Sequence, residues 1–257
     1  KLPQADLSLV IDPIASQLDF GLPWGYRANR VYTGEEETLD MIQSADPSYC
    51  LISQGLDDHC HLKTLTELQQ RVPSMKFIVA PSAEKKLSTI VDDKTKIIVL
   101  KPGGSMELPS SASDEECILT AVEGSLVGPP WADRENGWLL SVHSKQNGVK
   151  SVFYEPHADI KDETLESFNA DVVIAPVKKQ SLPVLTLVYG YERTPTIMEK
   201  LNAKVLIPLR NGELKSEGPF SMLVQSSGPV EGCKSLFNSE IRIEEATPGV
   251  PLTVRLG

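Results

Sequence analysis

The chain has 257 residues, of which 40% are hydrophobic and 23% charged, so it is long enough and apolar enough to bury a substantial core. Its formal net charge of −10 argues against nucleic acid as a partner, because proteins that bind nucleic acid need basic surface to contact phosphates. No apolar run is long enough to span a bilayer. The four cysteines form no CxxC pair, which favours free thiols in a reducing compartment.

The amino-terminal part of the chain alternates between short apolar runs and helical patterns. Residues 62, 65, 68 and 72, for example, are apolar at the spacing of one helix face. Strands are predicted at 6–13, 49–55, 76–81 and 96–103, and helices at 61–72 and 82–91. Strands and helices that alternate at this spacing predict parallel strands joined by crossover helices.

Further along the chain, the pattern changes to that of an antiparallel meander. Strands are predicted at 105–111, 117–125, 137–144 and 150–156, and Asn147 and Gly148 favour a tight turn in the last hairpin. Helices are then predicted at 161–170 and 194–203, and strands at 171–177, 204–209 and 241–245. Because there is no internal repeat and no linker rich in Pro, Gly or Ser, residues 1–257 are predicted to form a single domain.

The stretch LISQGLDDHCHLKTL, residues 51–65, concentrates polar side chains where a predicted strand ends and a helix follows. Open α/β sheets bind their ligands at the carboxyl ends of strands, so Asp58, His59 and His61 are candidate ligands of a metal ion. This loop, with LVIDP before it and KFIVAPSAEKKL after it, resembles the opening of a metallo-β-lactamase-fold protein, in the branch similar to ascorbate-6-phosphate lactonases. The family signature there is HxHxDH. The resemblance implies an α/β fold, the four-layer αβ/βα sandwich, with two sheets face to face.

The sequence departs from the family signature selectively. Gln54 and Leu56 occupy the positions of the first two histidines, and no histidine lies near Gly124, where the resemblance places a third. The resemblance therefore implies that the first of the two metal sites is absent. For the second site, the resemblance implies that Asp58 and His59 are retained as ligands. It also implies that His157 stands where the family has a bridging Asp. His61 is a fourth candidate, and one divalent ion, zinc foremost, suits such a donor set.

A structural reading of the same residues requires no metal. Asp58 is a favoured residue type for capping the helix that follows. His59 and His61 are then polar residues of a solvated turn, and His157, which follows a proline, is an exposed loop residue. Both readings stay open at this point.

The chemistry that the resemblance implies is hydrolysis at a metal-activated water. Asp57 and Asp159 are candidate general bases, and we expect Gln54 and Arg210 to contact the substrate. Arg210 has a second interpretation: it replaces the metal by pairing with Asp58, because a guanidinium matches a carboxylate well.

Two functions follow from these alternatives. One is a metal-dependent hydrolase acting on a small ester, lactone or phosphorylated metabolite. The other is a non-catalytic relative that serves as a binding or assembly module for a protein partner. The signature loop looks like that of cyanobacterial and plant-plastid relatives, and the chain begins at Lys1. We therefore expect a chloroplast protein of the stroma whose transit peptide has been removed, with the cytoplasm as the alternative.

Overall fold

The structure, a computed structural model, describes residues 7–109, 115–128, 131–146, 148–211, 213–228 and 233–256. Within these ranges all four cysteines are free and buried. No helix among them has the length and apolar character needed to cross a membrane. Asn147, which the sequence predicts to form a hairpin turn, lies outside the described residues.

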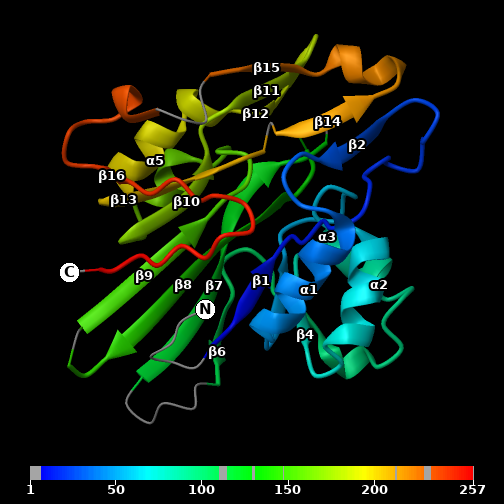
Figure 1. Cartoon of the computed structure of the whole chain (residues 1–257). Helices are drawn as coiled ribbons and strands as arrows, with labels where there is room; N and C mark the ends of the chain where they lie inside the picture. Colours follow the sequence, from blue (N-terminus) through cyan, green and yellow to red (C-terminus); the bar gives the residue numbers. More distant parts are fainter. Residues whose placement is uncertain are drawn as a thin grey trace.

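The first sheet contains four parallel strands in the order β1-β3-β4-β5. Its strands are β1 (Leu9–Ile11), β3 (Tyr49–Ile52), β4 (Lys76–Val79) and β5 (Ile97–Val99), and its helices are α1 (Glu35–Ala45), α2 (Leu62–Arg71) and α3 (Pro81–Leu87). The predicted strand–helix alternation is thus confirmed for β3, α2, β4, α3 and β5. Helix α1 was not predicted, because its first turn is acidic and its apolar face is too short to give a clear helical pattern. Figure 1 shows α1 and α2 together on the outer side of this sheet.

The second sheet has seven strands in the order β16-β13-β10-β9-β8-β7-β6. Strands β6 to β9 are antiparallel neighbours, as the meander pattern predicts, whereas β9, β10, β13 and β16 are parallel. The long strands β7 to β9 run side by side in Figure 1. The bounds are β6 (Ser105–Leu108), β7 (Glu115–Leu126), β8 (Arg134–Ser144), β9 (Gly148–Tyr154), β10 (Val172–Pro176), β13 (Val205–Leu209) and β16 (Arg242–Ile243), with α4 (Asp162–Leu165) and α5 (Thr194–Lys200) as the helices.

Two small sheets lie at one end of the molecule (Figure 1). One pairs β14 with β2, and the other has the order β12-β11-β15. Their bounds are β2 (Arg27–Arg30), β11 (Lys179–Leu182), β12 (Leu185–Val188), β14 (Leu214–Glu217) and β15 (Gln225–Ser227). Single turns of 3-10 helix occur at Lys94–Lys96, Gly190–Glu192, Pro219–Leu223 and Cys233–Leu236. None of the small-sheet strands was predicted, because they are short and mostly exposed, so they lack an apolar signature.

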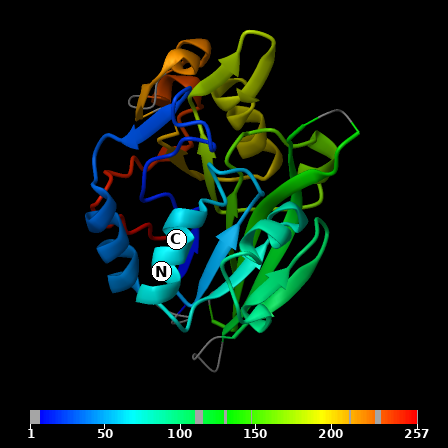
Figure 2. The ribbon, with the colours of Figure 1, turned by 90° about the vertical axis from the view of Figure 1, so that its right-hand side faces the viewer.

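The layer order follows from the two-residue period of the strands, which sends successive side chains to opposite faces. In β3, Cys50 and Ile52 pack against the helices α1 and α2, whereas Tyr49 and Leu51 face the second sheet. In β8, Trp138 faces the first sheet, and Leu139 packs toward α4 and α5. Helices, sheet, sheet and helices therefore succeed one another, which confirms the predicted four-layer sandwich. Figure 2 shows these layers from the side.

The helix predicted at 161–170 is shorter than expected. Only Asp162–Leu165 is helical, and the backbone N–H of Phe168 donates to Leu165 in a tighter turn. The carbonyl of Asn169 then accepts a hydrogen bond from Ser151 Oγ, which directs the chain into β10. Tertiary contact with β9 thus ends a helix that its sequence pattern alone would continue.

The sandwich makes Phe153 a test of the packing between the second sheet and its helices. Phe153 is fully buried in β9, so Phe153→Ala should lower the free energy of unfolding by about 3–5 kcal/mol. Val149, in the same strand, is 53% exposed, and Val149→Ala should change it by less than about 0.5 kcal/mol. Urea denaturation measures both values. Equal effects of the two substitutions would contradict the layer order.

Candidate metal centre

The candidate site lies where loops leave the carboxyl ends of strands from both sheets. Asp12 directly follows β1, Ser53 directly follows β3, and His157 follows β9 by three residues. The loop after β3 packs tightly on α3, because a Cβ at Gly55 would lie 2.5 Å from the carbonyl oxygen of Ser82. The facing sheets therefore bring residues from distant parts of the chain to one place.

Asp58, His59 and His157 form a three-residue cluster in which one ligand atom of each lies within 4.8 Å of the others. The two imidazole rings have centroids 4.9 Å apart and are tilted by 43°. Both histidines are buried, whereas the Asp58 side chain is 34% exposed. The cluster is therefore reached from the side of Asp58. Among the residues that the structure describes, it is the only such group of His, Cys, Asp and Glu side chains.

His59 is oriented by Asp12, whose Oδ2 lies 2.8 Å from His59 Nδ1. Asp12 in turn accepts hydrogen bonds from Ser53 N at 2.8 Å, Ser53 Oγ at 2.6 Å and the Tyr154 hydroxyl at 3.0 Å. Since Nδ1 is used by Asp12, the ring presents Nε2 to Asp58, whose Oδ2 is 3.6 Å away. A carboxylate that binds one ring nitrogen and frees the other for a metal is the usual outer-shell arrangement of histidine ligands.

The charge of His59 is set by the acids around it. Burial lowers the pKa of His59, but the negative charges of Asp58, Asp12 and Glu155 outweigh burial and raise the pKa to about 9. Without a metal the ring is therefore protonated at neutral pH, and an ion that binds Nε2 must displace that proton. Burial also raises the pKa of Tyr154 well above its usual value, so the phenol keeps its proton and donates it to Asp12.

The donor set fits a divalent metal ion. Zinc, manganese and iron all bind readily to two imidazoles and a carboxylate. In addition, Asp58 Oδ1 is buried and has no hydrogen-bond partner. Buried polar atoms normally find partners, and a bound ion would satisfy this oxygen.

The comparisons with known proteins agree with this geometry. A family model described as the beta-lactamase superfamily domain matches residues 1–210. The chain belongs to this superfamily. None of the curated proteins matches the sequence.

Solved structures of the metallo-β-lactamase fold are similar to the chain, at low sequence identity. Igni18, a metallo hydrolase from the hyperthermophilic archaeon Ignicoccus hospitalis, has a TM-score of 0.51 and 13% identity over 82% of this chain and 81% of that chain. Unliganded yeast PDE1 has a TM-score of 0.49 and 11% identity over 84% of this chain and 70% of that one. A diphosphatase of the PhnP family has a TM-score of 0.48 and 14% identity over 88% and 79%. At such identities the likeness shows the fold alone.

Gln54, which the resemblance places at the position of a histidine ligand, lies inside the site. Its Nε2 is 3.3 Å from His157 Nε2, so the amide donates to the unprotonated ring nitrogen, while its Oε1 has no partner. An amide is a much weaker ligand for zinc than an imidazole. Leu56, at the other superfamily position, is 47% exposed.

His61 is not part of the cluster formed by Asp58, His59 and His157. Its Nδ1 lies 2.8 Å from Thr64 Oγ1, where it precedes the first turn of α2, and burial lowers its pKa. His59 and His61 point apart because the loop turns tightly between them, with Cys60 N donating to Leu56 O.

The structural reading of these residues as solvated loop positions is wrong. His59, His61 and His157 are 7%, 8% and 9% exposed. The residue that precedes α2 as its cap is His61, and Asp58 does not cap this helix.

The predicted acids and Arg210 have other partners. Asp57 forms an ion pair with Lys86, and Asp159 accepts hydrogen bonds from Leu126 N and Arg134. Arg210 donates to the Ala246 carbonyl and to both oxygens of Glu213. Among the described residues, no ion pair joins Arg210 to Asp58, so the expected replacement of the metal by this arginine is not formed. Glu213 lies only three residues from Arg210 along the chain, much nearer than Asp58, and it is the acid with which Arg210 pairs.

The sequence analysis missed Asp12, Tyr154 and Glu135. Glu155 is fully buried, and its Oε2 accepts hydrogen bonds from the backbone N–H groups of His157 and Asp159. Glu135 accepts a hydrogen bond of 2.6 Å from Ser82 Oγ. Burial raises the pKa of Glu135, and the charges of His59 and His157 are near enough to oppose that rise. Of these residues, only Asp12 could have been predicted from the sequence, because an acid at the end of a predicted strand is a candidate for a site at the sheet edge.

The raised pKa of His59 predicts a pH-dependent stability for the metal-free protein. A folded pKa of about 9 against an ordinary 6.5 means that the stabilisation is complete below pH 6.5 and is lost as the pH rises through 9. The loss should be about 3 kcal/mol in the free energy of unfolding. Urea denaturation in EDTA across this range measures it. His59→Gln should remove this part of the pH dependence, and an unchanged slope in the variant would contradict the assignment.

Proposed function

We propose that this protein is a hydrolase that uses one divalent metal ion, with zinc as the expected ion, bound by Asp58, His59 and His157. The observation that carries this proposal is the convergence of these three ligand atoms within 4.8 Å, in a chain of the beta-lactamase superfamily. Two of the three residues are buried, and His59 is fixed by Asp12, so the cluster is formed before any ion arrives.

The substrate class follows from the number of ions that the residues can bind. When bound, a single ion with an open coordination position polarises a carbonyl oxygen and lowers the pKa of a water. A phosphodiester is better served by two ions, and here Gln54 and Leu56 stand where the resemblance places histidines of the other, absent metal site. We therefore favour a small ester or lactone over a phosphorylated metabolite.

The residues of the chain supply orientation and proton transfer. Asp12, Ser53 and Tyr154 fix the His59 ring, and Glu155 fixes the backbone that carries His157. The Gln54 amide lies beside His157, and its Oε1 has no hydrogen-bond partner, so it can accept a hydrogen bond from a substrate.

Glu135 is the best-placed acid for proton transfer. Asp57 and Asp159 are engaged by Lys86 and Arg134, whereas Glu135 has only the Ser82 hydroxyl as a hydrogen-bond partner. Burial raises the pKa of Glu135, and a raised pKa favours the protonated carboxyl that a general acid needs. We assign it the role of general acid.

Metal content tests the site. The protein purified without chelator should contain one zinc, manganese or iron ion per chain, read by elemental analysis, and His59→Ala should abolish it. His61→Ala and His143→Ala are matched controls, since both histidines lie outside the cluster, and they should retain the ion.

The same measurement separates the two functions. Stoichiometric metal that depends on His59 supports the hydrolase. A protein that takes up no divalent ion, even after incubation with excess zinc, would contradict the proposal and leave a non-catalytic binding module. Equal loss of metal in His59→Ala and His61→Ala would show that the ligand set is assigned wrongly.

Glu135→Gln tests the general acid. With an alkyl ester or lactone as substrate, kcat should fall by about 100-fold to 10,000-fold, while the metal content stays unchanged. With a p-nitrophenyl ester the loss should be much smaller, because p-nitrophenolate leaves without a proton. In the unmodified protein, kcat for the alkyl ester should fall as the pH rises through the raised pKa of Glu135. Equal losses with both esters would contradict this role.

A further inference from the structure

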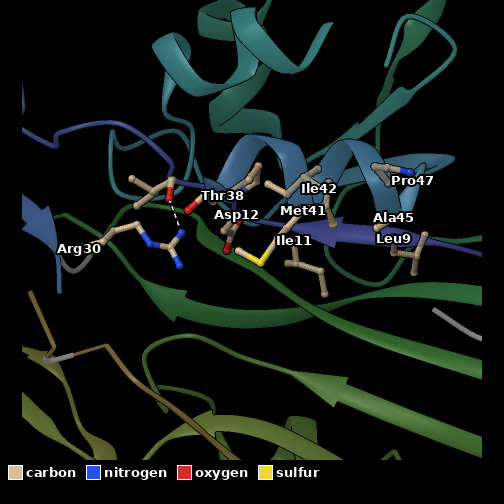
Figure 3. A pocket seen from close by; sticks show the side chains of 12 residues that line it. Leu9, Ile11, Asp12, Arg30, Thr38, Met41, Ile42, Ala45 and Pro47 are labelled. Atoms are coloured by element: carbon tan, nitrogen blue, oxygen red, sulfur yellow. Dashed lines mark hydrogen bonds between the residues drawn. The ribbon is translucent and has the colours of Figure 1, made fainter. Parts of the chain in front are cut away.

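A groove of about 370 Å³ lies between the edge strand β1 and helix α1, and one of its lining residues, Asp12, also contacts His59 of the metal cluster. Strand β1 pairs only with β3, so its outer side is left for α1 to cover. Figure 3 shows the lining side chains, which come from β1 and the residues after it, from α1, and from Arg30 at the end of β2. The volume lies in the range of small-molecule sites in proteins.

The groove is elongated, with a different chemistry at each end. Figure 3 shows Arg30 at one end and Leu9, Ala45 and Pro47 at the other. Between them lie the apolar side chains of Ile11, Met41 and Ile42. The strand from Leu9 to Asp12 and the helix from Thr38 to Ala45 both extend about 10 Å, so the apolar part has about that length.

Arg30 is a half-buried cation without an acidic partner in contact. Its Nη1 donates to the carbonyl oxygen of Ile14 at 2.8 Å, and among the described residues no carboxylate forms an ion pair with it. Burial lowers the pKa of Arg30, and only the more distant charge of Glu37 acts against this. Asp12, which also lines the groove, has its oxygens occupied by Ser53, His59 and Tyr154.

We propose that this groove binds a single-tailed amphipathic anion, a medium-chain carboxylate, with its head group at Arg30 and its apolar chain along Ile11, Met41 and Ile42. A guanidinium binds a carboxylate through two parallel hydrogen bonds and is the side chain best matched to it. The apolar walls bury a hydrocarbon chain of similar length. The groove borders the proposed metal centre at Asp12, but binding there does not depend on hydrolase activity.

Octanoate and octanol are the probes, because they share a chain of suitable length and differ in charge. Isothermal titration calorimetry of the full chain should show saturable binding of octanoate, with octanol weaker by about tenfold or more. Arg30→Gln should weaken octanoate by about tenfold to 100-fold and leave octanol unchanged. Ala45→Leu, which fills the far end, should weaken both probes.

Two further variants keep the test falsifiable. Arg27→Gln is the matched control, because Arg27 lies in the same strand, is exposed, and pairs with Glu217 at 3.7 Å, so octanoate binding should be unchanged. Arg30→Lys keeps the charge but not the two parallel hydrogen bonds, so its affinity for octanoate should lie between those of the wild type and Arg30→Gln. Octanoate that binds Arg30→Gln as it binds the wild type would overturn the proposal. So would equal affinity for octanol, absence of saturable binding, or a dimer in sedimentation that Ala45→Leu disrupts, since a second copy would then occupy the groove.

Discussion

The contact between Asp12 and His59 is the interaction on which the site depends. Asp12 is the first residue after β1, and its carboxylate joins β1 to Ser53 after β3, to His59 in the following loop and to Tyr154 at the end of β9. A buried carboxylate is costly unless it is paired and hydrogen-bonded, and Asp12 has four such contacts. The two sheets are thus connected through one charge, which also selects the ring nitrogen that faces Asp58.

The site stores unsatisfied polarity in its metal-free form. Gln54 Oε1, Asp58 Oδ1, Glu155 Oε1 and His157 Nδ1 are buried without hydrogen-bond partners. Each such atom costs about 1–3 kcal/mol in a protein interior. Folds tolerate these costs at functional sites, because the groups are recovered when a ligand binds. The hydrophobic clusters around Phe77, Trp138 and Phe153 stabilise the fold and offset this cost.

His59 and His61 show how a local turn divides two residues of the same type. Both follow Asp58 within three positions and both are buried. The tight turn from Leu56 to Cys60 directs His59 toward Asp12 and His61 toward Thr64. The carboxylates around His59 raise its pKa, whereas burial lowers the pKa of His61. Environment, not residue type, decides which histidine is a ligand candidate.

The sequence by itself predicted the elements with strong periodicity and offered candidates for the site. Apolar runs such as 49–55 and 76–81, bounded by turn residues, predicted buried strands. Asp58 and His59 follow the first of these runs, and the family resemblance added His157. Only the tertiary structure decided which polar residues meet. Asp12 and Tyr154 are 142 residues apart, and contacts across facing sheets leave no local pattern in the chain. Arg210 pairs with Glu213, three residues away, and not with Asp58. Helix α1 and the groove beside it were not predicted from the sequence. The apolar face of α1 is short, and its packing against β1, not its periodicity, defines both the helix and the groove.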